Sequence, residues 1–365
     1  MKTEQKILVI QTAFIGDIAL TIFFANEIKQ LFPDCELHFI TTKIGYEILK
    51  CFKIIDRVII FDKRNSHKGF AGIKNIAKQI NADINTKNKY DFIFSLHRSF
   101  RSAILTKLIN ANEKIGFNIN SFSFLLTKVI KYQKRLHEVE RNRQCLSILK
   151  NFDKNFDYSK SVESIVSSFV ISKEDIEIAK QLINNLDSKY NLGDRYIIDD
   201  RYIIVAPGSV WATKRWKPEY FTDLCKKFFV AGYKVFLIGS ESEIELCREI
   251  SHDSNAISLA GRTTIPQILE IIRNASLLVS NDSAPTHFAS IFNIPTVTIF
   301  GATASYFGFS PLANNSIVVE NDELFCRPCS PHGEKKCKRK HFDCMNSIKP
   351  ELIFDKAINI LAPQA

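Results

Sequence analysis

The strongest fold signal in this sequence is the alternation of short apolar runs with longer amphipathic segments. In the first half of the chain, the apolar runs span residues 6–11, 36–41, 57–61 and 90–96. A helical pattern from Asp17 to Leu31 follows the first run. Runs rich in β-branched residues that are separated by helical periods are typical of βαβ units, in which helices connect parallel strands. The pattern therefore predicts an α/β fold built on a parallel sheet.

The same alternation resumes after a more polar stretch between about residues 150 and 195. The later apolar runs span residues 201–209, 233–240, 256–261, 276–282 and 296–303. A chain of 365 residues exceeds what one hydrophobic core usually serves, and 45% apolar content is enough for two cores. We predict two doubly wound domains over residues 1–185 and 186–345, and a C-terminal helix within 346–365 that packs back toward the N-terminal domain.

The N-terminus superficially resembles a signal peptide over its first 24 residues. Gln11 and Asp17 interrupt the apolar stretch, however, and no small-residue cleavage site follows. No uninterrupted apolar run approaches the ~18 residues of a membrane-spanning helix. Five dispersed cysteines lie in apolar or helical contexts, as buried thiols of a reducing compartment do. We therefore expect a cytoplasmic protein, with any membrane contact peripheral and at the inner membrane's cytoplasmic face.

The basic balance of the chain indicates an anionic partner or a solvated basic surface. Forty-nine Lys and Arg against 39 Asp and Glu give a net charge of +10. The basic residues are mostly dispersed, which argues against a nucleic-acid partner. Neither GxGxxG nor GxxxxGK[ST] occurs after the apolar runs, so a dehydrogenase or a P-loop ATPase loses its main support.

In open parallel sheets, ligands bind beyond the carboxyl ends of the strands. After the first apolar run, Gly16 and Asp17 open a helix. Glycine lets the backbone approach a ligand closely, and a carboxylate at this place can take a proton from an attacking hydroxyl. The alternative is that Asp17 only caps its helix, and the local sequence leaves both interpretations open.

A second motif, APGSVWATKRWKPEYF at 206–221, presents Ser209 and then Lys214 and Arg215 between two tryptophans. Cations fixed by aromatic packing at a strand end suit a diphosphate that gains negative charge as it leaves. A solvated Lys214 is equally compatible with the spacing. After the run at 233–240, Glu241 is placed to accept hydrogen bonds from ribose hydroxyls, although an exposed glutamate that begins a helix is common.

The most specific local pattern is SNDSAPTHFASIF at 280–292. Here Asp282 follows a strand, and the backbone amides of Ser283 and Ala284 at a helix N-terminus predict an anion site. His287 can add a donor, and the alternative is a histidine that only packs in the core or on the surface.

These motifs occur in the order and approximate spacing of glycosyltransferase family 9. The matching stretches are IGD, PGS with KRWKPEYF, IGSESE, LAGRTT, SNDSAPTHFASIFNIPTVTIFGAT, and also YDFIFSLHRSFRSAILTKLI, IGFN and RLHEVERN. The chain resembles that family over roughly residues 6–345. Its best-known members are the ADP-heptose:lipopolysaccharide heptosyltransferases. The resemblance implies a GT-B architecture, with two Rossmann-like domains facing a central cleft, and an inverting transfer without a catalytic metal or cofactor.

The resemblance also implies residue roles. Asp17 matches the general base, Lys214 the lysine on the donor phosphates, and Glu241 the acidic residue near the nucleoside. The expected donor site comprises Gly16, Ser209, Lys214, Arg215, Glu241, Asp282, Ser283, Ala284 and His287. The implied reaction moves heptose from ADP-heptose onto a lipopolysaccharide-core or related glycan. Another nucleotide sugar or a protein acceptor is the alternative.

Acceptor recognition is expected in the N-terminal half. His97, Arg98 and Arg101 follow the run that ends at Leu96, and Lys63 follows another run together with Arg64. Cations there suit a phosphorylated or carboxylated glycolipid core, although solvated surface charge is as compatible with each one singly.

Four further cysteines, Cys326, Cys329, Cys337 and Cys344, have the spacing of a four-thiolate zinc site. Structural zinc, free thiols and disulfides all stay open. This cluster and the basic charge keep a nucleic-acid-binding zinc protein as a competing class. A non-catalytic binding protein would require the loss of Asp17 or Lys214, and both are present.

Overall fold

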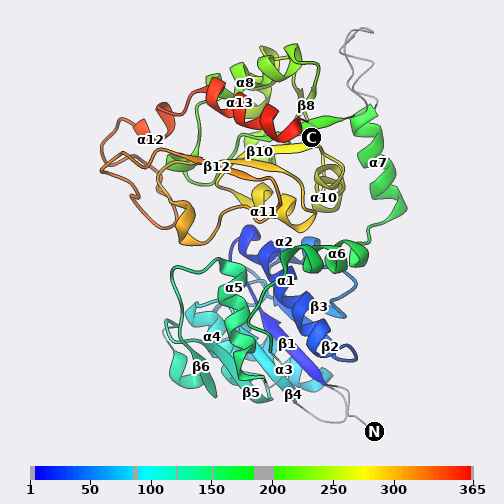
Figure 1. Ribbon diagram of the computed structural model, residues 1–365. Helices are drawn as coiled ribbons and strands as arrows, with labels where there is room; N and C mark the ends of the chain where they lie inside the picture. Colours follow the sequence, from blue (N-terminus) through cyan, green and yellow to red (C-terminus); the bar gives the residue numbers. More distant parts are fainter. Residues whose placement is uncertain (1–4, 85–88, 121, 150–151, 185–200, 363–365) are drawn as a thin grey trace. The chain divides into compact units, whose positions relative to one another are not determined.

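The computed structural model describes residues 5–84, 89–120, 122–149, 152–184 and 201–362. It divides into two compact units, Met1–Val170 and Ile171–Ala365. Each unit is built on one parallel six-stranded sheet with helices beside it (Figure 1). The predicted α/β class and the doubly wound sheets are confirmed.

The sheet of the first unit has the strand order β3-β2-β1-β4-β5-β6. Its strands are β1 (Lys6–Ile10), β2 (Glu36–Thr41), β3 (Arg57–Ile60), β4 (Tyr90–Ser95), β5 (Ala111–Phe117) and β6 (Lys128–Ile130). Its helices are α1 (Ile15–Leu31), α2 (Lys43–Leu49), α3 (Gly69–Asp83), α4 (Phe100–Leu108), α5 (Glu138–Arg143) and α6 (Tyr158–Ser168), with 3-10 turns η1 (Ser123–Leu125) and η2 (Gln144–Ile148). Sequence analysis missed β5 and β6, because polar residues interrupt their apolar pattern.

Helix α1 explains why the N-terminus resembles a signal peptide. Residues on all sides of this helix are buried, including Ile18, Phe23 and Phe24. The helix packs on β2, and α2, α5 and α6 also contact it. A helix that is apolar all round is one that its neighbours enclose. None of the helices in the described ranges has the length and apolar character needed to cross a bilayer.

The second unit has the strand order β12-β11-β10-β7-β8-β9. Its strands are β7 (Tyr202–Ala206), β8 (Lys234–Leu237), β9 (Ile257–Ser258), β10 (Leu277–Asn281), β11 (Thr296–Phe300) and β12 (Ile317–Glu320). Its helices are α7 (Lys173–Asn184), α8 (Pro218–Val230), α9 (Ile244–His252), α10 (Ile265–Arg273), α11 (Ala284–Ile291), α12 (Asp343–Asn346) and α13 (Pro350–Leu361). The 3-10 turns are η3 (Ala212–Lys214), η4 (Glu241–Glu243) and η5 (Ser305–Phe307).

The boundary between the units differs from the predicted one at 185/186, which itself falls on residues outside the described ranges. Helix α7 belongs to the second unit because it packs on α10, where Gln267 Nε2 donates to Asp175 Oδ1 at 2.8 Å. The C-terminal helix α13 belongs to the second unit. It packs on α8, and Ile353 and Ala357 lie in the core of the second unit (Figure 1).

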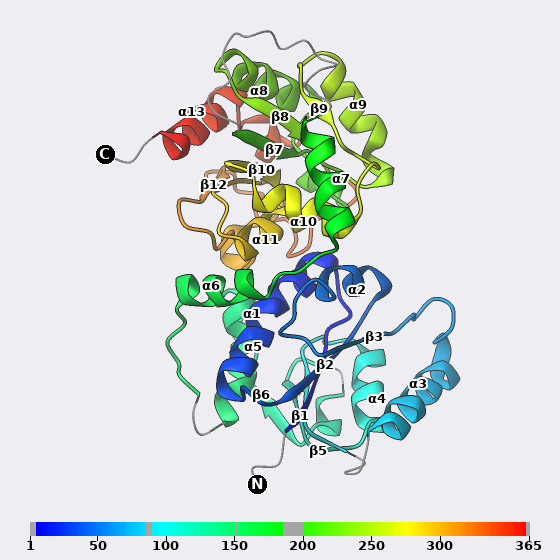
Figure 2. The same cartoon turned by 90° about the vertical axis from the view of Figure 1, so that its right-hand side faces the viewer.

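The strand orders define one switch point in each sheet. In the first unit, β2 pairs with β1 on one side and β4 pairs with β1 on the other. Helices α3 and α4 contact one another beside this sheet (Figure 2). In the second unit β7 lies between β8 and β10 in the same way. Crevices at such points, beyond the carboxyl ends of the strands, are the usual ligand sites of open parallel sheets.

Candidate active site

Asp17 lies in the first turn of α1, just beyond the carboxyl end of β1, and is half-buried next to the buried Gly16. No side-chain hydrogen bond caps the N-terminus of α1, although the backbone N–H groups of Asp17 and Phe14 favour the ionised form of the carboxyl group. Burial, and then the nearby charge of Glu138, raise the pKa of Asp17 to about 7. A carboxyl group with this pKa can exchange a proton near neutral pH, as the proton-acceptor interpretation requires.

The charge that acts on Asp17 belongs to a buried network on α5. Glu138 is buried and forms an ion pair of 2.8 Å with Arg141, whose Nη1 also donates to the Tyr132 hydroxyl at 2.9 Å. The guanidinium of Arg98 lies 4.5 Å from the centre of the Tyr132 ring. Our sequence analysis missed Glu138 as a candidate, although the RLHEVERN match contains it.

His97 follows β4, directly across the switch point from Asp17 in the strand order. Its Nδ1 lies 2.7 Å from Thr12 Oγ1, 3.0 Å from Ser102 Oγ and 3.2 Å from Ser99 Oγ. Burial, and then the charges of neighbouring cations, lower the pKa of His97 to about 4. His97 is therefore neutral at pH 7, which corrects the expectation that it contributes a positive charge.

The positive charge at this edge comes instead from lysine and arginine side chains. Lys63 Nζ donates to the backbone oxygen of Thr12 at 2.6 Å. Burial, and then the charges of Arg101 and Arg64, lower the pKa of Lys63 to about 8. Both arginines are exposed. Lys63 and Thr12 thus lie together at the ends of β3 and β1. The charge of Arg101 acts on the ammonium group of Lys63.

In the second unit, the predicted lysine and aspartate meet across the switch point. Lys214 Nζ lies 2.7 Å from Asp282 Oδ2, and the two side chains are only 13% and 7% exposed. Thr303 Oγ1 donates to the same carboxylate oxygen at 2.6 Å. Lys214 is therefore not a solvated surface lysine, because a buried carboxylate fixes the position of its ammonium group.

Trp216 fixes the loop that carries these cations, as the motif predicted. It is buried, and its Nε1 donates to the Ile348 backbone oxygen at 2.9 Å. Arg215 is exposed, and its Nε donates at 2.6 Å to the backbone oxygen of Ser209, which is buried. Ser209 and Arg215 are thus joined beside Lys214.

The predicted anion site at 282–287 is the N-terminus of α11. Ser283 is the N-cap and makes no side-chain cap hydrogen bond, while its Oγ lies 3.1 Å from Ser280 Oγ. Helix α11 begins at Ala284, so its first amides point toward the strand end with the positive end of the helix dipole. His287 is buried, with its ring 6.2 Å from that of Phe309.

Glu241 is exposed at the start of η4. In the same turn, it is the side chain of Glu243 that forms hydrogen bonds within the protein. Glu243 Oε2 accepts the Ser240 backbone N–H at 2.7 Å and closes a capping box. A Cβ added at Gly208 would lie 1.7 Å from Glu243 Oε1. The glycine of the PGS motif therefore makes room for this carboxylate, a role that sequence analysis did not identify.

The four C-terminal cysteines, all within the described ranges, form no disulfide with one another. Cys329, Cys337 and Cys326 all influence the pKa of Cys344, which burial raises to about 11. Burial opposes ionisation of Cys337, but backbone N–H groups that donate to its sulfur give it a lowered pKa. Across the described ranges, no group of three or more His, Cys, Asp or Glu side chains is placed to hold a metal ion. The zinc site stays a prediction.

Two doubly wound parallel sheets, one in each unit, give the chain the GT-B class of fold. The sequence model of glycosyltransferase family 9 (heptosyltransferase) matches residues 84–342. The chain therefore belongs to glycosyltransferase family 9, as the motifs predicted.

Relatives of known name cover nearly the whole chain. Lipooligosaccharide heptosyltransferase 2 of Campylobacter jejuni is 24% identical over 363 residues, which is 98% of each chain. The glycosyltransferase family 9 structure from Veillonella parvula has a TM-score of 0.81 at 21% identity and covers 99% of this chain and 98% of its own. The Escherichia coli heptosyltransferase WaaC with ADP-2-deoxy-2-fluoro heptose has a TM-score of 0.67 at 16% identity, covering 96% and 98%.

Proposed function

We propose that this protein transfers heptose from ADP-heptose onto a lipopolysaccharide-core glycan, with inversion at the anomeric carbon and without a catalytic metal. Family membership, the names of the relatives and the sugar-nucleotide analogue in the WaaC structure support the donor and the acceptor class. The observation that carries the proposal is Asp17, a carboxyl group with a pKa of about 7 at the switch point of the first unit.

Asp17 acts as the general base. A carboxylate with a raised pKa is a stronger base than an ordinary one, and with a pKa of about 7 about half of the groups are ionised at pH 7. The acceptor hydroxyl gives its proton to Asp17 as its oxygen attacks the anomeric carbon. The bond between that carbon and the diphosphate oxygen breaks, and ADP leaves with the electron pair.

Lys214 stabilises the departing diphosphate. Its ammonium group is held by Asp282, and the Arg215 guanidinium and the first amides of α11 lie at neighbouring strand ends. Fixed positive groups of this kind offset charge that develops in the transition state, which is the role that a divalent cation has in other transferases. The paired Asp282 orients the lysine.

The acceptor site is at the β1, β3 and β4 ends of the first unit. Lys63, Arg64 and Arg101 provide positive charge for an anionic glycan. Neutral His97 provides a ring nitrogen for a sugar hydroxyl, because its pKa of about 4 keeps it uncharged. No role for nucleic acid is needed to account for these cations.

We further propose that the enzyme works in the cytoplasm, at the inner membrane, where a lipid-linked acceptor is accessible. The rings of Phe100 and Phe122 lie 4.8 Å apart, and those of Phe122 and Phe124 lie 5.6 Å apart. Phe100 and Phe124 are 51% and 75% exposed. Exposed aromatic side chains suit the interface of a bilayer, and the net charge of +10 favours an anionic one.

For the cysteine cluster we propose a structural metal ion, with zinc as the expected metal. The segment 321–342 contains no helix or strand, yet its thiols influence one another and a thiolate at Cys337 is stabilised. Elemental analysis of the purified protein should find about one metal ion per chain. Cys337→Ser should lose it, and Cys247→Ser, at a buried cysteine of α9, should keep it. A wild-type protein without metal would contradict this proposal.

The donor site is tested by calorimetry with ADP, GDP, UDP and ADP-heptose in the presence of EDTA. We expect ADP and ADP-heptose to bind wild type and Asp17→Asn alike, and Lys214→Ala to weaken both by roughly tenfold or more. Transfer to a heptose-deficient core glycolipid should be lost in both variants. A preference for GDP or UDP would mean that the donor is another nucleotide sugar. Binding of none of the four would overturn the transferase mechanism.

A further inference from the structure

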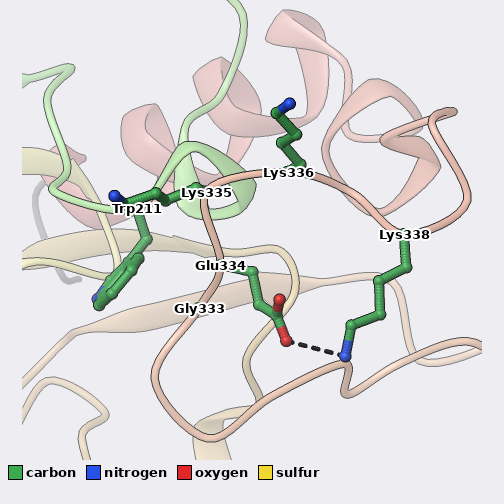
Figure 3. A pocket seen from close by; sticks show the side chains of 6 residues that line it. All are labelled: Trp211, Gly333, Glu334, Lys335, Lys336 and Lys338. Atoms are coloured by element: carbon green, nitrogen blue, oxygen red, sulfur yellow. Dashed lines mark ion pairs between the residues drawn. The ribbon is translucent and has the colours of Figure 1, made fainter.

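A basic hollow lies in the second unit beside the proposed donor site. Its volume is about 630 Å³. It is lined by Trp211, Gly333, Glu334, Lys335, Lys336 and Lys338 (Figure 3). Neither the base nor the leaving-group machinery uses any of these side chains.

The wall of the hollow is held rigidly against η3. Thr213 Oγ1 accepts a hydrogen bond from the Glu334 backbone N–H at 2.7 Å. The Thr213 backbone N–H donates to the Glu334 backbone oxygen at 3.1 Å. Gly333 has a φ of +89°, and a Cβ there would lie 2.8 Å from Trp211 Cβ. Only glycine fits this backbone position without strain, so the segment closes tightly over Trp211.

The hollow borders the lysine that is proposed to hold the donor phosphates. A Cβ at Gly333 would lie 3.1 Å from Lys214 Cγ. Lys214 is also the last residue of η3, three positions after Trp211. A molecule in the hollow would therefore lie next to a donor bound at Lys214.

The side chains define the chemistry of the ligand. Trp211 is half-buried, and an aromatic face of this kind packs against the apolar C–H face of a sugar ring. Three lysines and one glutamate line the hollow, and Glu334 is already paired with Lys338 at 3.0 Å. Figure 3 shows Glu334 and Lys338 pointing toward one another and Lys336 pointing away from them. Lys335 is exposed beside this pair.

We propose that this hollow is a subsite for an anionic sugar of the acceptor glycan, one that carries a phosphate or a carboxylate. The inference rests on the proposed function and adds to it a second point of acceptor recognition. The charge of the donor is already matched by Lys214, Arg215 and the first turn of α11. A separate set of lysines around an aromatic ring therefore indicates a site for a second anionic molecule. Lys335 is the main cation that the protein offers to this molecule.

Tryptophan fluorescence tests the binding directly. The chain has two tryptophans, and Trp216 is only 1% exposed, so an added ligand should change mainly the Trp211 emission. We expect glucose 6-phosphate and glucuronate to give a saturable change and glucose to give none. Lys335→Gln should weaken the response roughly tenfold, as expected for the loss of a charge-assisted contact. Lys226→Gln, at an exposed lysine of α8 that does not line the hollow, is the matched control and should bind as wild type does.

Saturating ADP separates this subsite from the donor site. If the sugar phosphate still binds in its presence, the subsite is distinct. If ADP abolishes the response, or if Trp211→Phe retains it, the inference is overturned.

Steady-state kinetics link the subsite to transfer. With a phosphorylated core acceptor, Lys335→Gln should raise the acceptor KM roughly tenfold and leave the ADP-heptose KM unchanged. The same acceptor without phosphate should not distinguish the variant from wild type. An active wild type with identical kinetics for Lys335→Gln and Lys226→Gln would refute the subsite alone. A wild type inactive with every acceptor would refute the proposed function instead.

Discussion

The ionisation of Asp17 should set the pH dependence of the reaction. A general base acts in its ionised form, and burial raises the pKa of this carboxyl group to about 7. We therefore expect kcat/KM to fall by roughly tenfold per pH unit below pH 7 and to level off above it. A pH–rate profile measures this directly. A profile that is flat between about pH 5 and pH 8 would remove Asp17 from the role of base.

Glu138→Gln should move this profile to lower pH. The negative charge of Glu138 opposes ionisation of Asp17, so its removal lowers the pKa of Asp17. The part of the pH–rate profile in which kcat/KM rises, its rising limb, should then lie at lower pH than in the wild type. Glu140→Gln, on the same helix but not among the groups that shift Asp17, is the control and should leave the limb in place.

Because Glu138 is buried and paired with Arg141, its replacement also affects stability. Breaking such a pair costs about 3–5 kcal/mol when the partner charge is left unpaired, and the amide of glutamine keeps part of the hydrogen bonding. The thermal unfolding of Glu138→Gln and Glu140→Gln should therefore be measured alongside their kinetics. A folded Glu138→Gln enzyme with an unshifted limb would show that the network only supports the fold.

At the scale of elements, the close approach of η4 to the end of β7 depends on one glycine. A Cβ at Gly208 would displace the Glu243 carboxylate, which is the flexible end of its side chain. The displacement breaks the capping box with Ser240. We expect Gly208→Ala to cost about 0.5–2 kcal/mol, the usual worth of an N-terminal cap, as measured by urea unfolding.

The double variant tests this mechanism. Glu243→Ala alone should cost a similar amount, and Gly208→Ala with Glu243→Ala should cost little more than either one. Additive losses would mean that Gly208 is required for another reason, such as backbone conformation.

Helix α1 shows how the environment of an element changes the meaning of its sequence. Its apolar residues are distributed all round, which in isolation resembles a secretory signal. The sheet and helices α2, α5 and α6 cover it, so the same composition is that of an internal helix.

At the scale of the whole molecule, membrane contact is the most direct prediction. The protein should bind vesicles that contain anionic phospholipid, because it carries a net charge of +10 and exposes Phe100 and Phe124. Phe124→Glu should weaken cosedimentation with these vesicles by roughly tenfold, the value of burying one aromatic ring. Val230→Glu changes another exposed apolar residue, 84% exposed at the end of α8, and should have little effect. Equal losses would refute a specific aromatic contact.

The two parallel sheets were predictable because a buried parallel strand reads as a local apolar run. The edge strands β6 and β12, and β5 next to β6, were not, since their partly exposed faces carry polar residues. The unit boundary was misplaced for a similar reason. Helix α7 has an ordinary amphipathic sequence, and only its packing on α10 assigns it to the second unit.

The sequence by itself determined the α/β class, the presence of two sheets and the family, because periodicity and motif order are properties of neighbouring residues. Its motifs also placed Asp17, Lys214 and Asp282 at strand ends. Only the tertiary structure decided their chemical states. Lys214 is held by Asp282, Asp17 has a pKa of about 7, and His97 is neutral. Burial and the charges of residues far along the chain set these states, and both exist only once the chain has folded.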